Sequence, residues 1–247
     1  MSPVPSPAPA SPTPLELIPV HGIGEIRPGD ELAELIADAA DGQGTPLASG
    51  DCLVVTQKVV SKAEGRLVAL DPDDLDARRA LVERESRRIV RRRGDLVISE
   101  TYHGFVCANA GIDLSNVEAG QAALLPVDPD SSAHHIRNAL GARRAVDVAV
   151  IVSDTFGRPW RMGLTDVAIG VAGIAAVVDL RGSEDALGRV LHVTEVAIAD
   201  EIAGAAELVM GKAAGVPAAI VRGLDAGWFG AGAARDLIRD PQEDLFR

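Results

Sequence analysis

The chain has 247 residues, of which 47% are hydrophobic but only 3% are aromatic. That length is enough for one large domain or two interlocked small ones, with a core of aliphatic side chains. Its 36 acidic residues against 24 basic ones give a net charge of −12, which repels nucleic acid and anionic membrane surfaces. We therefore expect neither as a partner, and a polyanionic ligand would need a local cluster of basic residues.

The N-terminal segment 1–14 alternates proline with serine and alanine. Such a composition buries too little apolar surface to fold, so we expect a disordered tail followed by one catalytic region over 15–247. The N-terminus lacks the basic start and apolar stretch of a signal peptide, and no segment approaches the roughly 20 apolar residues of a membrane span. These features predict a cytoplasmic protein. Cys52 and Cys107 lie in apolar runs, which predicts buried free thiols.

In the first half of the chain, short apolar runs alternate with turns. Asp30 precedes apolar residues at helical spacing from Leu32 to Ala39, which predicts a helix with Asp30 as its N-cap. The next run, 57–66, is compatible with either a strand or a helix. We expect strands over 15–20, 52–56, 95–100 and 104–107, a solvated amphipathic helix over 71–93, and a small-residue loop over 109–117.

The second half begins with a helix predicted near Ser131 or Ser132. The clearest strand of the sequence, Asp147 to Ser153, is predicted to end just before Asp154 and Thr155. We expect a deeply buried, closely packed segment over 164–178, a helix over 193–209 ending at Gly211, and a last strand over 218–221. Because strands and helices alternate irregularly, we predict an α+β fold of mixed, largely antiparallel sheets in two interleaved lobes.

Two aspartates, Asp113 and Asp154, lie in or beside predicted turns and have small hydroxyl or amide residues as neighbours. Carboxylates of this kind suit a divalent cation such as Mg²⁺, which proteins typically hold with one or two carboxylates plus substrate phosphates. Aspartate is also a common turn residue, so an ordinary structural role is the alternative for each.

Lysine is scarce: Lys58, Lys62 and Lys212 are the only ones, and all other basic residues are arginine. Lys58 and Lys62 share one face on either a strand or a helix. Two ammonium groups on one face favour a phosphate-bearing substrate, although a pair of solvated lysines remains the alternative. The nucleotide-binding motifs GxxxxGK[ST] and GxGxxG after a strand are absent.

Four segments of the chain form a distinctive set of motifs: VVTQKVVSKAEGR (54–66), NAGIDLSNV (109–117), VIVSDTFGRPWR (150–161) and TEVAIADEIAGAAELVMGKAAGVPAAIVR (194–222). These four segments resemble the family of coenzyme F420:L-glutamate ligases. The likeness continues in order from about Leu15 to about Phe246. Together the four segments are highly specific for this family.

The resemblance implies a GTP-dependent ligase that adds L-glutamate, and then further γ-linked glutamates, to the carboxylate of a deazaflavin cofactor precursor. It implies an acyl-phosphate intermediate, release of GDP and phosphate, Mg²⁺ or Mn²⁺ at a two-metal site, and K⁺. Relatives of this length form intertwined homodimers, which we expect here. Bacterial relatives carry a further C-terminal flavin-binding domain, which we do not expect in a chain ending at Arg247.

Site residues follow from the same resemblance. Asp113 and Asp154 match metal-binding carboxylates, Thr155 matches a ligand of the second metal, and Lys62 matches a catalytic and nucleotide-contacting residue. The remaining matches are all expected to contact the nucleotide: Ile23, Gly24, Glu25, Ile26, Gln57, Asn116, Met210, Gly211 and Lys212.

Three of these positions depart from the family pattern. Gly24 lies where relatives usually have proline, Gln57 where a small hydroxyl residue is common, and Lys212 where some relatives have an acidic or amide metal ligand. A protonated lysine cannot coordinate a metal. Two other functions remain open at this point: a ligase that glutamylates another carboxylate-bearing cofactor, and a non-catalytic nucleotide- or metal-binding interaction protein.

Overall fold

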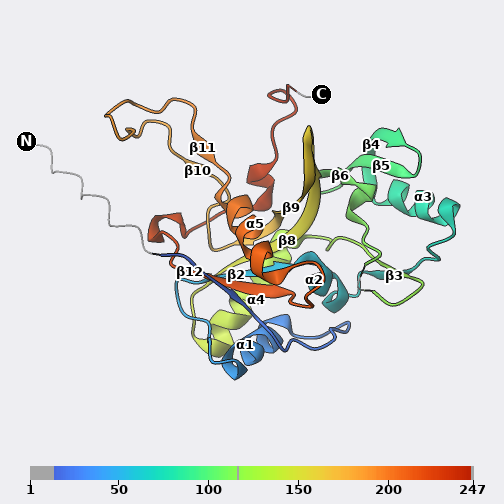
Figure 1. Cartoon of the computed structure of the whole chain (residues 1–247), viewed down its shortest axis with the longest axis horizontal. Coiled ribbons are helices and arrows are strands. Elements are labelled where there is room, and N and C mark those ends of the chain that lie inside the picture. The colour runs from blue at the N-terminus through green and yellow to red at the C-terminus, as the bar shows by residue number, and fades with distance from the viewer. Residues whose placement is uncertain (1–13, 116, 246–247) are drawn as a thin grey trace, which may run out of the picture.

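The computed structural model describes residues 14–115 and 117–245. The predicted tail therefore lies outside the described residues, except for Pro14. A five-stranded sheet in the order β1-β12-β2-β8-β9 forms the centre of the fold (Figure 1). Its strands are β1 (Glu16–Pro19), β12 (Ala218–Arg222), β2 (Cys52–Thr56), β8 (Ala149–Arg158) and β9 (Arg161–Ala172). β2 and β8 are parallel, whereas all other neighbours in this sheet are antiparallel.

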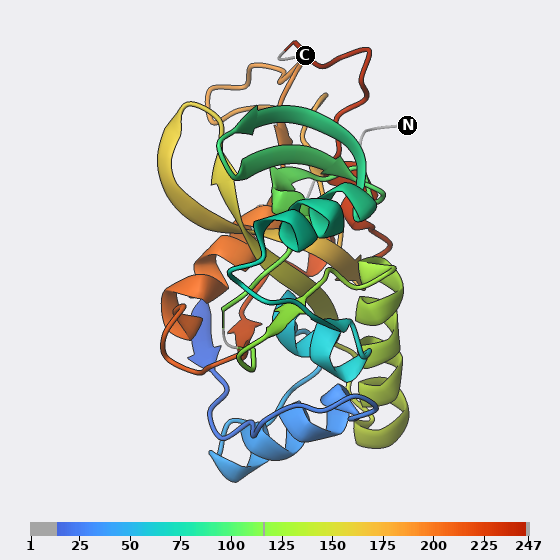
Figure 2. The same cartoon turned by 90° about the vertical axis from the view of Figure 1, so that its right-hand side faces the viewer.

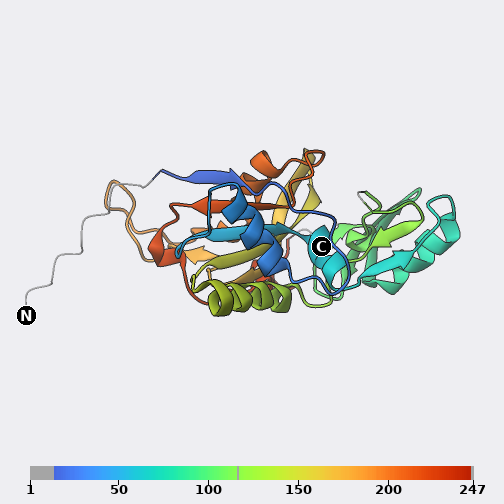
Figure 3. The same cartoon turned by 90° about the horizontal axis from the view of Figure 1, so that it is seen from below.

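Helices cover both faces of the central sheet. α4 (Pro129–Arg144) packs on β8 and β9, with α1 (Leu32–Gly42) against it. α5 (Ile198–Met210) lies on the opposite side (Figure 3). The short helix α2 (Gln57–Ala63) follows β2 directly. This layering buries the sheet on both sides, and the residues of β2 from Cys52 to Val55 are fully buried.

Smaller sheets flank this centre. A three-stranded sheet of β4 (Ser86–Arg93), β5 (Leu96–Thr101) and β6 (Val106–Ala108) lies with α3 (Leu75–Arg84) to the right in Figure 1. β3 (Leu67–Ala69) pairs with β7 (Gln121–Ala123), and β10 (Val178–Asp179) pairs with β11 (Glu195–Val196). Short 3₁₀ turns occupy Asn109–Gly111, Ala226–Trp228 and Ala234–Leu237. The α+β class and its mixed, largely antiparallel sheets are thus confirmed, while the interleaved lobes and the homodimer stay predictions.

Most predicted strands are confirmed, as are the buried free thiols of Cys52 and Cys107. The predicted close packing around Gly170 is also confirmed, because a Cβ atom there would overlap the carbonyl oxygen of Pro129. The helix near Ser131 is confirmed as α4, and Asp128 caps it by accepting a hydrogen bond from the Ser131 amide. No helix among the described residues is long and apolar enough to cross a membrane.

The prediction of a single helix over 71–93 is wrong. α3 ends at Arg84, and Ser86–Arg93 forms β4, which pairs antiparallel with β5. The side chain of Ser86 is buried, and its hydroxyl donates to the Val82 carbonyl at the end of the helix. A run of exposed arginines fits an edge strand as well as a helix, because neither needs an apolar stripe when most of its side chains face water.

Three boundaries also differ from the predictions. Asp30 does not cap α1: its carboxylate accepts a hydrogen bond from the Arg27 amide, and the helix begins at Leu32 without a side-chain cap. α5 begins at Ile198 rather than 193, because Glu195–Val196 pairs with β10. β8 continues through Asp154 and Thr155 to Arg158, since it forms a hairpin with β9. In the segment predicted to be deeply buried, Leu164 is instead exposed.

Candidate active site

A pocket of about 750 Å³ opens at the carboxyl end of β2, where its parallel pairing with β8 ends at Thr56 and Ser153. Ligand sites commonly form at this edge of sheets with parallel strands, since neighbouring chain segments diverge there. Residues from β2, α2, β8, β9 and α5 contribute, together with the loops before α1 and after α5. The pocket is lined by Ile23, Gly24, Glu25, Ile26, Thr56, Gln57, Lys58, Val59, Lys62, Asp113, Val117, Glu118, Ser153, Asp154, Thr155, Asp166, Glu207, Met210, Gly211, Lys212, Gly215, Val216 and Pro217.

Helix α2 presents the two paired lysines to the pocket. The segment 57–66, for which the sequence allowed strand or helix, is helical over Gln57–Ala63. Lys58 and Lys62 are therefore i and i+4 neighbours on one helical face. The Gln57 amide anchors this helix by donating to the Ser61 hydroxyl (2.7 Å) and to the Leu124 carbonyl (2.9 Å), so its donors are engaged within the fold.

A left-handed turn carries the chain to Asp113. Asn109, Ala110 and Gly111 all have positive φ, at 50°, 55° and 71°. A Cβ atom on Gly111 would lie 2.8 Å from the Leu125 side chain, which explains glycine at this position. The Asn109 side chain holds the turn by accepting a hydrogen bond from the Val97 amide (3.0 Å). This conformation is costly for non-glycine residues and is a recurrent feature of functional sites.

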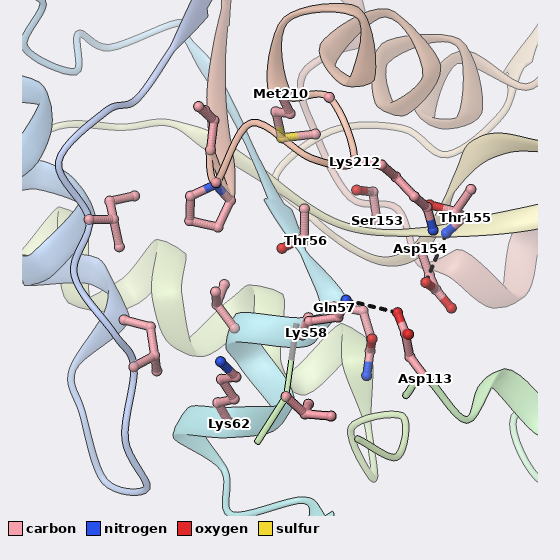
Figure 4. Close-up of a pocket in the computed structure, with 18 of the residues that line it drawn as sticks. Thr56, Gln57, Lys58, Lys62, Asp113, Ser153, Asp154, Thr155, Met210 and Lys212 are labelled. Atoms are coloured by element: carbon pink, nitrogen blue, oxygen red, sulfur yellow. Dashed lines mark hydrogen bonds and ion pairs between the residues drawn. The ribbon is translucent and has the colours of Figure 1, made fainter. Parts of the chain in front are cut away.

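Asp113 makes an ion pair within the pocket. Its carboxylate lies 2.9 Å from Lys58 Nζ (Figure 4). It also accepts a hydrogen bond from the Ser115 amide at 2.7 Å. Burial alone would raise the pKa of Asp113, but hydrogen bonds from Ser115 and the ammonium of Lys58 outweigh it, so the pKa is lowered. Asp113 is therefore charged at neutral pH.

Strands β8 and β9 bring two more aspartates to the pocket. Asp166 lies opposite Thr155 and accepts hydrogen bonds from the hydroxyls of Ser153 (2.9 Å) and Thr155 (2.7 Å). Asp154 accepts the Thr155 amide hydrogen bond at 2.8 Å. Because the Thr155 hydroxyl donates to Asp166, its oxygen lone pairs remain available to a ligand.

The electrostatics of the pocket are set by crowded carboxylates. Burial, together with repulsion from Asp113 and Asp166, raises the pKa of Asp154 to about 7, although the hydrogen bond from the Thr155 amide and the ammonium of Lys212 oppose the shift. Burial and Asp166 likewise raise the pKa of Glu207, again opposed by Lys212. When the charged form of a carboxylate is destabilised in this way, an approaching cation stabilises it.

Nearly all predicted site residues converge on this pocket. Every one of them within the described residues lines it, and Lys62 also forms an ion pair with the carboxylate of Glu25. Asn116 lies outside the described residues. All three lysines of the chain line the same pocket.

Sequence reasoning missed several polar residues of the pocket, among them Asp166, Ser153 and Glu207. Asp166 is a lone acid at the start of a long buried apolar run, and that signal could have marked it as a buried functional carboxylate. Ser153 is the last residue of a predicted strand and gave no signal of its own. Glu207 lies on an amphipathic helix, where an acidic residue is ordinary.

The side chains here fit a divalent cation. Asp113, Asp154 and the Thr155 hydroxyl supply oxygen donors, which Mg²⁺ and Mn²⁺ prefer. Asp166 orients Thr155 by accepting a hydrogen bond from its hydroxyl, an interaction typical of residues that surround metal ligands. Among the described residues no group of three or more His, Cys, Asp or Glu side chains is arranged to hold a metal by itself.

Comparison with known proteins assigns the chain to a family. The family model described as F420-0:Gamma-glutamyl ligase matches residues 22–223, which include every described residue of the pocket. The chain belongs to this family, and the resemblance found in the sequence is confirmed.

Archaeal relatives are similar over nearly their whole length. "Coenzyme F420:L-glutamate ligase" of Methanothermobacter thermautotrophicus is 46% identical over 249 residues, covering 94% of this chain and 99% of the relative. The protein of the same name from Methanopyrus kandleri is 44% identical, with 94% and 98% covered. That of Methanocaldococcus jannaschii is 41% identical, with 87% and 90% covered.

Proposed function

We propose that this protein catalyses GTP-dependent ligation of L-glutamate to the carboxylate of coenzyme F420-0, a deazaflavin, and then adds further γ-linked glutamates. The observation that carries the proposal is the gathering of all three lysines with the carboxylates of Asp113, Asp154 and Asp166 in the one pocket. Lysines suit the phosphates of the nucleotide, and carboxylates suit the cation that accompanies them. The names of the archaeal relatives supply the glutamate and the acceptor.

The chemical problem is that a carboxylate is a poor electrophile. An oxygen of the acceptor carboxylate attacks the γ-phosphorus of GTP, the bond to the β-phosphate oxygen breaks, and GDP leaves. The glutamate amine then attacks the acyl carbon of the resulting acyl phosphate, loses a proton, and displaces inorganic phosphate. Such phosphoryl transfer depends on positioning and charge stabilisation more than on a nucleophilic side chain.

The lysines and carboxylates have separate roles in this scheme. Lys58 and Lys62 on α2 bind phosphate oxygens of the nucleotide, which would draw Lys58 from Asp113 and Lys62 from Glu25. Lys212 lies beside Asp154 and offsets the negative charge there. Asp113 and Asp154, with the Thr155 hydroxyl, would hold Mg²⁺ or Mn²⁺, which neutralises phosphate oxygens when bound.

The nucleotide is expected to lie between the loop Ile23–Ile26, α2 and the chain from Met210, the last residue of α5, into the loop that follows it. Its guanine base, a contribution from K⁺, and a homodimeric assembly are carried over from the family resemblance. L-Glutamate and the deazaflavin precursor complete the set of small-molecule substrates.

The direct test mixes purified protein with GTP, Mg²⁺ or Mn²⁺, L-glutamate and F420-0. Phosphate release and a product heavier by one glutamyl residue are expected only in the complete mixture, with ATP a poor substitute for GTP. Phosphate release without a glutamylated product would contradict the proposal. Absence of metal-dependent GTP binding in calorimetry would instead favour a non-catalytic interaction protein. A mass-spectrometric screen of other carboxylate-bearing cofactors distinguishes a ligase that glutamylates one of them from a ligase that acts on F420-0.

A further inference from the structure

The hairpin of β8 and β9 runs past the pocket and ends in exposed apolar side chains. Trp160 is 80% exposed, Met162 is 96% exposed and Leu164 is 62% exposed. Figure 2 shows the two strands, in yellow, curving away from the helices as a free-standing hairpin. In a chain with only two tryptophans, one of them at such an end requires a physical reason, because large exposed apolar surfaces usually mark binding sites.

One face of the hairpin is continuous with the pocket. Thr155 pairs with Asp166, and two residues farther along the hairpin Gly157 pairs with Leu164. Side chains on a strand alternate between faces, and directly paired residues share a face. Leu164 therefore lies on the face that carries Thr155 and Asp166, about 7 Å from Asp166 along β9 toward the end of the hairpin at the usual rise per residue.

Gly157 leaves this part of the face flat. Its φ is not in the left-handed region that favours glycine. A Cβ atom at Gly157 would have only an ordinary contact, 3.9 Å from Leu164 Cδ2. Neither backbone conformation nor packing thus requires glycine, although glycine weakens a strand. Because Gly157 has no side chain, the backbone beside Leu164 is uncovered, and a flat ligand group can approach it closely.

The end of the hairpin has a defined shape. Arg158 reaches across it and donates a hydrogen bond from Nη2 to the Met162 carbonyl at 3.0 Å. Trp160 adopts φ 55°, a left-handed conformation that is uncommon for a bulky residue. Residues persist in such conformations where the surrounding structure fixes them, often at ligand sites.

We propose that the strip formed by Gly157 and Leu164 binds the planar ring system of the acceptor, while the acceptor carboxylate reacts in the pocket. This inference rests on the proposed function, which requires an acceptor with a carboxylate at one end and a planar heteroaromatic ring at the other. Planar rings stack on flat apolar surfaces, and this strip is the continuation of the pocket along β8 and β9. The strip acts as a specificity determinant and takes no part in bond making.

The test measures ring binding separately from catalysis. The probe is a deazaflavin that lacks the carboxylate-bearing arm, titrated by fluorescence against the full chain without GTP or metal. Gly157→Val fills the strip and Leu164→Ser removes its apolar side chain. Each is expected to raise the Kd of the probe and the KM for F420-0 at least tenfold, with GTP affinity unchanged. Leu187→Ser, at a residue that is 79% exposed on the β10–β11 hairpin loop, is the matched control and is expected to leave both values as in the wild type.

Three outcomes would overturn the inference. One is that the wild-type protein does not bind the ring compound, and another is that both variants bind it as tightly as the wild type. The third is that the variants lose ring affinity only because a dimer dissociates in size-exclusion chromatography, which would assign the strip to a second copy of the chain. Ring binding with no glutamylation of F420-0 by the wild type would instead refute the proposed function alone.

Discussion

Two regions of this molecule concentrate charge, and they do so in opposite ways. In the pocket, Lys58 and Lys62 are largely buried and lie against carboxylates. The edge strand β4 carries a run of exposed arginines. Arg87 and Arg88 both form ion pairs with Glu100. Arg91 and Arg93 have no ion-pair partner among the described residues. The pocket shields its two α2 lysines from water, and desolvated charges interact far more strongly than solvated ones.

The contrast teaches that the number of charges in a segment says little about its function. The arginine run is the more conspicuous feature of the sequence, yet its solvated side chains mainly keep an edge strand from pairing with other chains. The four predictions below test this contrast, beginning with the largest expected effect.

The largest effect is expected from Asp154→Asn. Loss of one metal-binding carboxylate should reduce turnover at least about a thousandfold. The melting temperature of the metal-free protein should not fall, because the substitution removes a buried charge repelled by Asp113 and Asp166. Phosphate-release kinetics and differential scanning calorimetry measure the two effects.

Asp147→Asn is the matched control for that substitution. Asp147 precedes the same strand, but its carboxylate is exposed and pairs with Arg137 at the surface. Its turnover should equal that of the wild type. If Asp154→Asn keeps more than about a tenth of wild-type turnover, the assignment of Asp154 is wrong.

A smaller loss is expected from Lys58→Met. Hydrogen bonds to charged groups contribute about 1.5–3 kcal/mol, so the Kd for GTP should rise about 10-fold to 100-fold. Binding of Mn²⁺ in the absence of nucleotide should not weaken, because Asp113 loses the ammonium that competes for it. Calorimetric titrations of GTP and of Mn²⁺ test both statements, and unchanged GTP affinity would contradict the role of Lys58.

Asp128 is intermediate between the pocket charges and the arginines of β4, because it is exposed but is held by hydrogen bonds at the start of α4. Asp128→Ala should lower the unfolding free energy by about 1 kcal/mol at pH 7. Hydrogen bonds from the Ser131 amide and hydroxyl lower the pKa of Asp128 in the folded state. Its contribution is therefore complete above the unfolded pKa of about 3.9 and is lost as the pH falls through the lower folded value.

Unfolding of the wild type, Asp128→Ala and Asp128→Asn between pH 2 and pH 7 checks this prediction. The difference between wild type and alanine should shrink at low pH, while asparagine should cap the helix at every pH. A difference that does not depend on pH would mean that the charge of Asp128 plays no part.

The smallest effect is expected on β4. Arg91→Met and Arg93→Met should each change stability by less than about 0.5 kcal/mol and should leave the Kd for GTP unchanged. The same change of a long cation to methionine is thus compared at a solvated and at a buried position. Loss of GTP binding in either arginine variant would refute the distinction between the two regions.

The sequence predicted the central sheet and the pocket better than their surroundings. The buried strands β2 and β12 have apolar, β-branched runs that allow few alternatives, and the family motifs identified Asp113 and Asp154. β4 was mistaken for part of a helix because its exposed arginines carry no apolar period. Asp166 and Glu207 were missed because only the pairing of β8 with β9 and the packing of α5 bring them to the pocket.

The most direct test of the account follows one oxygen atom. If the pocket activates the acceptor by phosphoryl transfer, an ¹⁸O label in the carboxylate of F420-0 is carried into the acyl phosphate and then into inorganic phosphate. The phosphate released during a wild-type reaction is analysed by mass spectrometry. If both carboxylate oxygens are labelled, nearly all phosphate molecules should contain one ¹⁸O. If only one of the two oxygens is labelled, about half of the phosphate molecules should contain it. Glutamylated product accompanied by unlabelled phosphate would contradict the mechanism.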